Sequence, residues 1–336
     1  MLVKNSMKQS IDLSIVIPVY NSEKDLPLCL SAIKVQKYPK EKIEILLCDG
    51  GSTDQTIEIG KRFGCKIIHN PKRLAEFGVT LGMTKAIGRF ITILAADNEL
   101  IGTDFITNII YPFNQDRRVM ITYPIQVSTE NDYWISKYIN MFTDPISHFV
   151  YGNASNTRTF GLGYQTIQKN ERYIIYNFSS VDYPMIALAQ GTTMRKQEGE
   201  RNNPGDDILP IVDAITRKAY LAYVPKAQVA HHTISSLSQY FRKQRWAFDN
   251  YLLGSEYGIK KRIIYFSSTR KFKKLVWPIY AGLFVLPLVV SIIGYIVSGK
   301  KEWLYHFPLT VTSFTALVFE LMRVTILRRQ KIHRKI

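Results

Sequence analysis

The sequence is poor in cysteine, and its first ten residues are largely polar. Its 336 residues include three cysteines, Cys29, Cys48 and Cys65, and none of them belongs to a C-x-x-C pair. An odd count without such pairs excludes a disulfide framework, so we expect reduced, buried thiols in a cytosolic domain. The polar stretch at residues 1–10 has no apolar run after its basic residues, so it is not expected to act as a signal peptide.

Acidic residues are scarce near the C-terminal end. Residues 258–336 contain 15 Lys or Arg but only Glu302 and Glu320, so they carry a net +13 of the chain's +17. The positive charge flanks apolar runs, which is typical of juxtamembrane clusters that bind anionic headgroups. The distribution therefore favours membrane lipids over nucleic acid as the partner of this charge.

Two long runs near the C-terminal end lack charge. Residues 275–297 are 23 residues without a charged side chain, and residues 303–319 are 17 more. About 20 apolar residues cross a bilayer, so we expect two transmembrane helices within 275–327, the first loosened by Pro278 and Pro287. A basic interfacial segment (258–274) precedes them and a basic cytosolic tail (328–336) follows. The positive-inside rule places both ends in the cytosol and the loop at 298–302 outside. The alternative is a pair of buried core helices.

The first hundred residues alternate between strand-like and helix-like patterns. Apolar, β-branched runs occur at 13–19, 43–48, 66–68 and 90–95, and helical patterns at 23–34, 53–63 and 74–87. This alternation predicts an α/β fold with a mostly parallel sheet covered by helices on both faces, within one cytosolic domain at residues 1–257. A late strand is expected at 221–224 and a helix at 236–257. Residues 124–190 show no motif.

Polar residues follow the first two strands. The segments are Ile-Pro-Val-Tyr-Asn-Ser-Glu at 17–23 and Leu-Cys-Asp-Gly-Gly-Ser-Thr-Asp-Gln-Thr at 47–56. Ligands of parallel sheets bind at the carboxyl ends of the strands, so Tyr20, Asp49 and Asp97 should converge on one crevice. The paired glycines allow close approach of a ligand, and Asp49 can accept hydrogen bonds from a nucleobase or ribose. Ser52 or Thr53 could instead simply cap the next helix.

Taken together and in this order, the two segments resemble glycosyltransferase family 2. The resemblance covers roughly residues 13–251 and is strongest in the first hundred. It implies the GT-A fold and a nucleotide-sugar donor, with Pro18, Tyr20, Glu23 and Asp49 around the nucleoside. Gly50 stands where many members have a second Asp.

The family's D-x-D element implies a divalent cation, Mg²⁺ or Mn²⁺, that neutralises charge on the diphosphate leaving group. The corresponding segment here reads Leu-Ala-Ala-Asp-Asn-Glu at 94–99. Asp97 matches the last Asp and Ala95 replaces the first. A shifted register would pair Asp97 with Glu99, and a third possibility is that Asp97 only shapes a turn.

A pair of carboxylates, Asp206 and Asp207, precedes Pro225 and His231 at the spacing of family members that glycosylate a hydroxyl. The resemblance implies that Asp207 is the general base and Asp206 its acidic neighbour. A base is needed because a sugar hydroxyl is a poor nucleophile until its proton is removed. The alternative is an acidic helix N-terminus stabilised by the helix dipole.

Further residues fall near family positions with less certain roles. His231 could contact the metal or the diphosphate, although His232 beside it makes the choice ambiguous. Arg242 and Arg245 lie on one helix face and, with Trp246, resemble the family's Q-x-x-R-W motif. They could hold diphosphate or a phosphorylated acceptor, or form a solvated basic helix, and Trp246 could stack on acceptor sugar or pack.

These patterns predict an enzyme that transfers a sugar, from a UDP-linked or related donor, to a hydroxyl of a lipid-linked glycan at the cell membrane. Such a reaction suits exopolysaccharide or cell-envelope glycan assembly. One alternative is a polyprenyl-phosphate glycosyltransferase, whose ionised acceptor would not need the Asp206–Asp207 pair. Another is a non-catalytic nucleotide-sugar-binding membrane protein, which Ala95 would favour.

Overall fold

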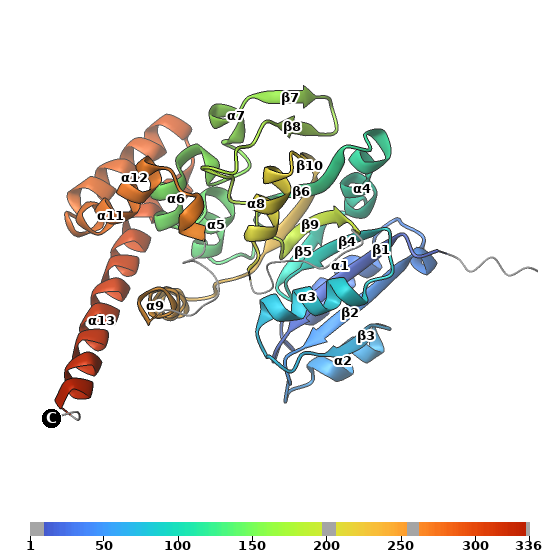
Figure 1. Ribbon diagram of the computed structural model, residues 1–336, viewed down its shortest axis with the longest axis horizontal. Coiled ribbons are helices and arrows are strands. Elements are labelled where there is room, and N and C mark those ends of the chain that lie inside the picture. Colours follow the sequence, from blue (N-terminus) through green and yellow to red (C-terminus); the bar gives the residue numbers. More distant parts are fainter. Residues whose placement is uncertain (1–9, 197–205, 254–261, 334–336) are drawn as a thin grey trace, which may run out of the picture. The chain divides into compact units, whose positions relative to one another are not determined.

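The computed structural model describes residues 10–196, 206–253 and 262–333 (Figure 1). The chain divides into two compact units. Unit 1 comprises Met1–Ile125, Thr166–Asn177 and Ile186–Val229, and unit 2 comprises Gln126–Gln165, Phe178–Met185 and Ala230–Ile336. The predicted boundaries at 257, 274 and 327 stay predictions, and residues 254–261, with part of the basic segment, lie outside the described residues.

Unit 1 is built on a ten-stranded mixed sheet with the order β3-β2-β1-β4-β9-β6-β10-β8-β7, in which β5 also pairs with β10. Its strands are β1 (Leu13–Val19), β2 (Ile43–Asp49), β3 (Lys66–His69), β4 (Phe90–Leu94), β5 (Asn98–Ile101), β6 (Val119–Val127), β7 (Thr166–Lys169), β8 (Ile174–Tyr176), β9 (Gln190–Arg195) and β10 (Tyr220–His231). The first four pair in parallel, as the apolar runs predict. The pairings of β9 with β4 and β6, and of β8 with β7 and β10, are antiparallel.

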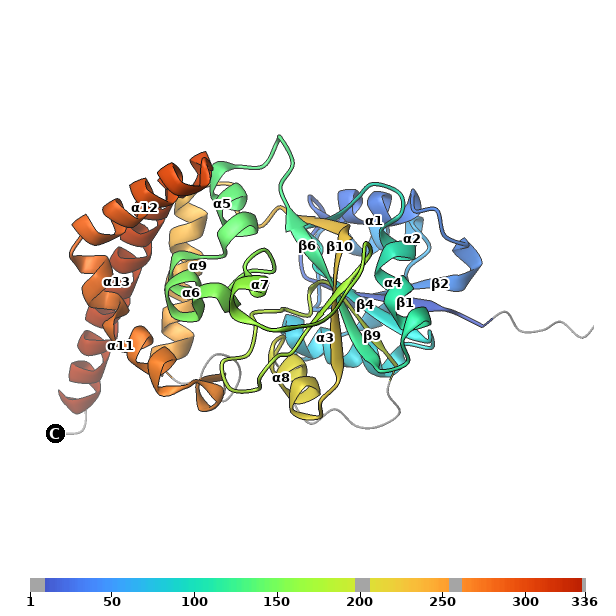
Figure 2. The ribbon, with the colours of Figure 1, turned by 90° about the horizontal axis from the view of Figure 1, so that it is seen from above.

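Helices cover both faces of this sheet (Figure 2), which confirms the predicted layering. They are α1 (Leu26–Lys34), α2 (Thr56–Arg62), α3 (Ala75–Lys85), α4 (Phe105–Gln115) and α8 (Leu209–Thr216). Alternation along β1 supplies both faces: Ile15 and Ile17 belong to the core that includes α1 and α4, whereas Val16 lies under α3. A Cβ at Gly82 would lie 2.3 Å from Val16 Cγ1, so α3 approaches β1 closely because this position is glycine.

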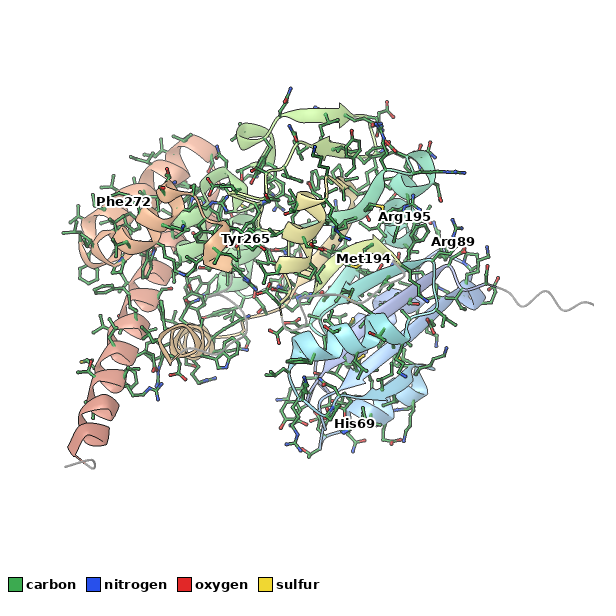
Figure 3. All side chains as sticks on the ribbon, in the orientation of Figure 1. His69, Arg89, Met194, Arg195, Tyr265 and Phe272 are labelled. Atoms are coloured by element: carbon green, nitrogen blue, oxygen red, sulfur yellow. The ribbon has the colours of Figure 1, made fainter. Side chains whose placement is uncertain are left out.

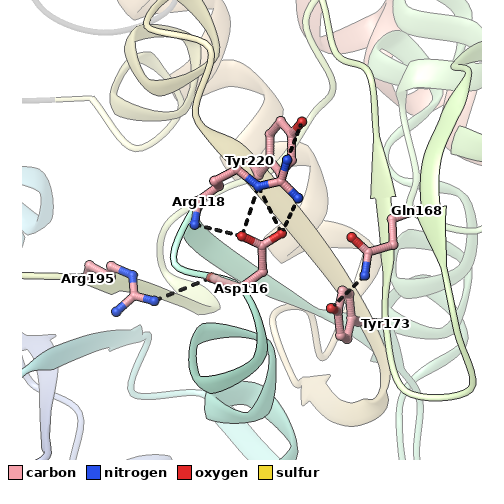
Figure 4. A network of polar contacts seen from close by, with 6 residues as sticks. All are labelled: Asp116, Arg118, Gln168, Tyr173, Arg195 and Tyr220. Atoms are coloured by element: carbon pink, nitrogen blue, oxygen red, sulfur yellow. Dashed lines mark hydrogen bonds and ion pairs between the residues drawn. The ribbon is translucent and has the colours of Figure 1, made fainter.

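A polar network stabilises the end of β9 that pairs with the start of β4, away from the predicted site after β4. The Arg195 guanidinium donates to the Val119 carbonyl at 2.8 Å and to the Phe113 carbonyl, which ties the end of β9 to α4 and β6. The Arg118 guanidinium donates hydrogen bonds to both oxygens of the Asp116 carboxylate, and the Nη2–Oδ2 distance is 2.7 Å (Figure 4). These contacts satisfy polar groups where α4 ends, and they lie outside the predicted donor site.

Unit 2 is mainly helical. Its elements are α5 (Trp134–Phe142), α6 (Pro145–Tyr151), η2 (Gly152–Ala154), α7 (Phe160–Gly163), α9 (Leu237–Leu253), η3 (Ile263–Tyr265), α11 (Ser268–Gly282), α12 (Val285–Ser298), η4 (Lys301–Tyr305) and α13 (His306–His333). Its core includes Tyr138, Tyr240 and Leu309, drawn from α5, α9 and α13. Residues 124–190, which show no motif in the sequence, thus supply two of the helices on which the C-terminal helical elements pack.

The C-terminal apolar runs do not form two straight helices. One helix in the described part of the chain, at Lys301–Ile326, is long and apolar enough to cross a membrane. The other run is broken at Leu283–Phe284 into α11 and α12, which meet at 97°. The break lies between Pro278 and Pro287, the two prolines expected to loosen this run, and Phe284 adopts a φ of 47° there.

Candidate donor site

The turns after β1 and β2 are joined by hydrogen bonds between side chains and backbone. The Asn21 carboxamide oxygen accepts from Thr53 N at 2.8 Å, and Asn21 N donates to Ser52 Oγ at 2.9 Å. Ser22 N donates to Thr56 Oγ1 at 2.7 Å. Asn21 has a φ of 47°, a conformation that asparagine tolerates better than most residues. The Y-N-S segment therefore has an architectural task that sequence reasoning did not assign to it.

Two acidic residues extend this cross-linking. Asp54 accepts from Glu23 N at 3.1 Å and from Thr56 N at 3.0 Å. Glu23 accepts in turn from Gln55 N at 3.1 Å, so one oxygen of a residue predicted to surround the nucleoside is bonded to the second turn. These bonds satisfy backbone N–H groups in the turns and at the first residue of α2, which have no partner within a helix or strand. The paired turns consequently form one preorganised ledge.

Asp49 lies at the end of β2 and is 6% exposed. Its carboxylate accepts from Gly51 N at 2.9 Å and from Ser52 Oγ at 2.6 Å. Ser52 N also donates to both carboxylate oxygens, at 3.1 and 3.2 Å. These bonds fix the orientation of the carboxylate and occupy most of its roughly four lone-pair positions. Tyr20, by contrast, is 55% exposed at the end of β1. The ledge thus presents an aromatic ring beside an anchored carboxylate, a combination suited to a nucleoside.

Arg73 is a site residue that sequence reasoning missed. It follows β3 in an exposed turn, has a φ of 59°, and its N donates to the Asn70 carbonyl at 3.2 Å. A Cβ on Gly51 would lie 3.8 Å from Arg73 Nε, so the guanidinium lies over this glycine. The ledge therefore gains a cation that could pair with phosphate oxygens. The Asn-Pro turn before Arg73 is the only local signal for it.

The turn after β4 carries Asp97. Ala95 N donates to Asn98 Oδ1 at 2.9 Å and to the Ala189 carbonyl at 3.1 Å. Asn98 N donates in turn to the Ala95 carbonyl. Asp97 lies half-buried within this turn, three residues after the end of β4 and directly before β5, and its register against the D-x-D element stays a prediction. Asn98 Nδ2 is buried and has no hydrogen-bond partner among the residues described. Sequence reasoning assigned no role to Asn98, which shapes this turn.

Asp206 and Asp207 lie where the chain enters α8. Asp206 Oδ1 accepts from Ile208 N at 2.7 Å and from Leu209 N at 2.8 Å, so its carboxylate organises the start of the helix. This geometry matches the alternative of an acidic helix N-terminus. Asp207 is half-buried, and its carbonyl accepts from Leu188 N at 2.9 Å. Pro204 and Gly205, which precede the pair, lie outside the described residues.

One short segment joins the two candidate catalytic elements. Leu188 bonds the backbone of Asp207, and its neighbour Ala189 bonds Ala95 in the turn of Asp97. Thr192 Oγ1 donates to the Ala187 carbonyl at 2.7 Å and closes the bend between this segment and β9. The structure therefore brings the turn that contains Asp97 and the backbone of Asp207 to the same segment, within unit 1.

The donor set suits a cation bound mainly through its ligand. Among residues 10–196, 206–253 and 262–333, no group of three His, Cys, Asp or Glu side chains could hold a metal. Mg²⁺ commonly uses one or two protein carboxylates together with water and substrate phosphates. Asp97 could supply one such carboxylate, so the residues fit a divalent cation that arrives with a diphosphate.

The remaining predicted residues belong to unit 2. His231 ends β10, and its carbonyl accepts from Asn140 Nδ2 at 3.2 Å. Arg245 Nε donates to the buried Glu320 carboxylate at 2.6 Å, and its guanidinium lies 3.9 Å from the Phe319 ring centroid. Arg242 and Trp246 lie on the same helix, where Trp246 is 63% exposed. Arg245 is thus committed to a contact within unit 2 that its sequence neighbourhood did not reveal.

A family model identifies the chain. The model of glycosyl transferase family 2 matches residues 14–182, half of the chain, and so includes both paired turns and the turn of Asp97. The chain belongs to glycosyl transferase family 2. The mannosyltransferase PcManGT of Pyrobaculum calidifontis, solved with GDP-Man and Mn²⁺, has a similar fold, with a TM-score of 0.50 and 12% identity over 92% of this chain and 86% of that one.

Similarity to curated proteins is strongest over short stretches. The chain is 38% identical over 91 residues to the dolichyl N-acetyl-alpha-D-glucosaminyl phosphate 3-beta-D-2,3-diacetamido-2,3-dideoxy-beta-D-glucuronosyltransferase of Methanococcus voltae, a match that covers 25% of this chain and 28% of that protein. It is 25% identical over 278 residues to an uncharacterized glycosyltransferase of Haemophilus influenzae, over 76% of this chain and 93% of that protein. The first match spans less than a third of its partner's length.

Proposed function

We propose that the protein is a glycosyltransferase that moves a sugar from a nucleoside diphosphate sugar, UDP-linked or related, to a hydroxyl of a lipid-linked glycan. The observation that carries this proposal is the segment at Leu188–Ala189, which bonds the Asp207 carbonyl and Ala95 N, two residues before Asp97. Family membership and the fold shared with a sugar-nucleotide-bound mannosyltransferase support the donor class. The methanococcal relative, named for a dolichyl-linked acceptor, supports the lipid-linked acceptor.

In this proposal the paired turns bind the nucleoside. Tyr20 packs on the base, Asp49 accepts a hydrogen bond from the base or ribose, and Pro18 and the Glu23 turn complete the ledge. Arg73 would pair with the diphosphate across Gly51. Mg²⁺ or Mn²⁺, when bound at Asp97, would supply charge neutralisation of the leaving diphosphate. His231, Arg242, Arg245 and Trp246 remain proposed contacts to metal, diphosphate or acceptor.

Asp207 would accept the proton of the acceptor hydroxyl, and Asp206 would hold Asp207 in place through its bonds to the start of α8. Removal of that proton makes the hydroxyl oxygen nucleophilic toward the anomeric carbon as the diphosphate departs. The same arrangement would serve a cell-envelope or exopolysaccharide glycan. Two arrangements at the membrane fit this role, namely two spans, as the sequence predicts, or attachment to one leaflet.

The proposal is tested by nucleotide-sugar binding and hydrolysis with the purified full chain. We expect one sugar nucleotide of a panel to stabilise the protein thermally, more strongly with Mn²⁺. Asp97→Ala should abolish the Mn²⁺ increment, whereas Asp49→Ala should weaken nucleoside diphosphate binding with or without metal. If neither variant changes binding, the donor site is wrongly assigned. If binding occurs without any hydrolysis or transfer, the non-catalytic alternative becomes the better account.

A further inference from the structure

The loop between α12 and α13 packs against helices that the two-span topology would place on the opposite side of the membrane. The Trp303 ring lies 4.6 Å from Phe142 and 5.2 Å from His148, and Tyr305 lies 4.8 Å from Trp134, measured between ring centroids. In a spanning hairpin this loop would be separated from α5 and α6 by a hydrocarbon core about 30 Å thick. These contacts leave no room for a bilayer.

The long helix α13 packs beside a charged helix. Tyr240 of α9 hydrogen-bonds Ser313 of α13 at 2.9 Å, and Arg245 pairs with Glu320 one to two turns farther along. Arg323 pairs with both Glu320 and Asp249 of α9. Charged side chains are costly within a bilayer core, so a helix joined to α9 by these pairs is poorly suited to crossing one. The apolar length of α13 is therefore insufficient evidence for a span.

The exposed apolar surface of unit 2 is concentrated on α11 and α12. Each helix is about 21–23 Å long at 1.5 Å per residue, short of the roughly 30 Å of a hydrocarbon core. Of the chain's large apolar residues that are exposed, many lie between 272 and 297, including Phe272 at 63% (Figure 3), Leu275 at 75%, Ile279 at 65%, Ile292 at 44%, Ile293 at 54% and Ile296 at 71%. Large exposed apolar surfaces on soluble proteins usually mark sites of interaction with a protein or a membrane.

Basic residues border this apolar surface. Lys271 is exposed at the start of α11, and Lys300 and Lys301 are exposed just after α12. Apolar residues bordered by Lys suit the interface of a leaflet with anionic headgroups. We propose that α11 and α12 form an elbow that docks on one leaflet, with the α12–α13 loop on the same side of the membrane as unit 1. This inference holds whatever the sugar and acceptor are.

Cysteine accessibility separates one-leaflet docking from two spans. The native thiols of Cys29, Cys48 and Cys65 are buried, which leaves a low labelling background. We expect Lys300→Cys, like the reference variant Lys85→Cys on the exposed end of α3, to react with an impermeant maleimide only after the cells are opened. Labelling of Lys300→Cys in intact cells, with Lys85→Cys still protected, would overturn the proposal.

Vesicle binding tests the docking surface itself. The double variant Ile292→Asp with Ile296→Asp changes exposed positions, so folding should persist, as a thermal melt would verify. Its binding to phosphatidylcholine vesicles containing phosphatidylglycerol should fall by more than about tenfold. Ile167→Asp on β7, an apolar position in unit 1 that is 45% exposed, about as exposed as Ile292, should bind like wild type. Unchanged binding by the double variant would overturn the docking surface, whereas donor hydrolysis reports on the proposed function independently.

Discussion

The turns after β1 and β2 differ in construction from the elements that carry Asp97 and Asp207. In the paired turns, Asn21, Glu23 and Asp54 use side-chain oxygens to bond backbone N–H groups of the facing or adjacent turn. In the turn after β4, backbone groups and Asn98 hold Ala95, and a shared segment holds the backbone of Asp207. Because side chains cross-link the paired turns in this way, we call them the locked frame.

This difference separates two tasks within one site. Polar side chains that accept hydrogen bonds from backbone N–H groups define the shape of the ledge. Their loss should therefore lower stability as well as donor binding. Carboxylates placed by backbone contacts should be removable with little effect on folding. The comparison therefore predicts that substitutions in the paired turns lower stability, whereas substitutions of Asp97 or Asp207 lower activity without affecting folding. Measuring both stability and turnover for each variant tests this prediction.

The largest effect is expected at Asp207. Asp207→Asn keeps size and hydrogen bonding but cannot take a proton, so turnover should fall by about 10²–10⁴-fold, or about 3–5 kcal/mol of barrier. Donor affinity and melting temperature should barely change, and the acid limb of the rate profile should disappear. Asp206→Asn should cost less turnover but more stability.

Asp213→Asn is the matched control for this measurement, because Asp213 lies on α8, which begins just after Asp207, and is half exposed and paired with Arg217. It should leave turnover unchanged. Near-normal turnover of Asp207→Asn would defeat the hydroxyl-acceptor proposal. A polyprenyl-phosphate acceptor, which is already ionised and needs no base, would then explain the enzyme better.

The next effect concerns the locked frame. Asp54→Ala removes the acceptor for Glu23 N and Thr56 N, and hydrogen bonds to charged groups contribute about 1.5–3 kcal/mol each. Because both N–H groups can partly recover water, we expect a loss of roughly 1–3 kcal/mol in the free energy of unfolding, measured by urea denaturation. Glu58→Ala, an exposed position on the following helix, should change it little. Equal stability of the two variants would show that the frame is not locked.

Sequence pattern anticipated most of the first half of unit 1. The run at 13–19 coincides with β1 because buried parallel strands are continuously apolar. The strand pattern also predicts the neighbourhoods of Asp49, the last residue of β2, and of Asp97, in the turn after β4. The predicted helices at 23–34 and 53–63 begin later, at Leu26 and Thr56. Their first residues serve the cross-linked turns, and helix-compatible composition does not reveal that use.

The parts of the fold and the site that the sequence did not predict depend on contacts between residues distant in sequence. The antiparallel pairing of β9 between β4 and β6 joins segments about 70–100 residues apart, and no local period marks it. Arg245 is paired with Glu320, 75 residues later, so its helix-face pattern alone suggested a ligand contact. Arg73 reaches Gly51 only because its turn closes over the ledge. Such pairings are set by tertiary structure, beyond what spacing can show.

A smaller effect is expected where the frame meets the ligand. Arg73→Ala removes the guanidinium over Gly51 without touching the hydrogen bonds of the paired turns. If it pairs with the diphosphate, affinity for the nucleoside diphosphate should fall by roughly tenfold, about 1.4 kcal/mol, while the nucleoside alone binds unchanged. Calorimetry with both ligands tests this. Lys72→Ala, its exposed neighbour, is the control, and equal losses in both variants would indicate only a diffuse electrostatic effect.

The smallest effect on stability is expected at Glu44, near the start of β2. Its carboxylate accepts from Ser14 Oγ at 2.5 Å, from Lys66 Nζ at 2.8 Å and from Ile87 N at 2.7 Å. Burial by itself would raise the pKa of Glu44, but the bonds from Lys66, Ser14 and Ile87 outweigh it and lower that pKa below 4.5. The folded state therefore binds this proton less readily than the unfolded state.

The sign of the pH dependence follows from that difference. A lowered pKa stabilises the fold above the unfolded value of about 4.3, and the contribution is lost as the pH falls through the folded pKa. Glu44→Gln should cost about 1 kcal/mol at pH 7 and less near pH 3, so its stability should depend less on pH than that of wild type. Parallel stability profiles for the two proteins would show that the hydrogen bonds, rather than the charge of Glu44, support the strands below the donor ledge.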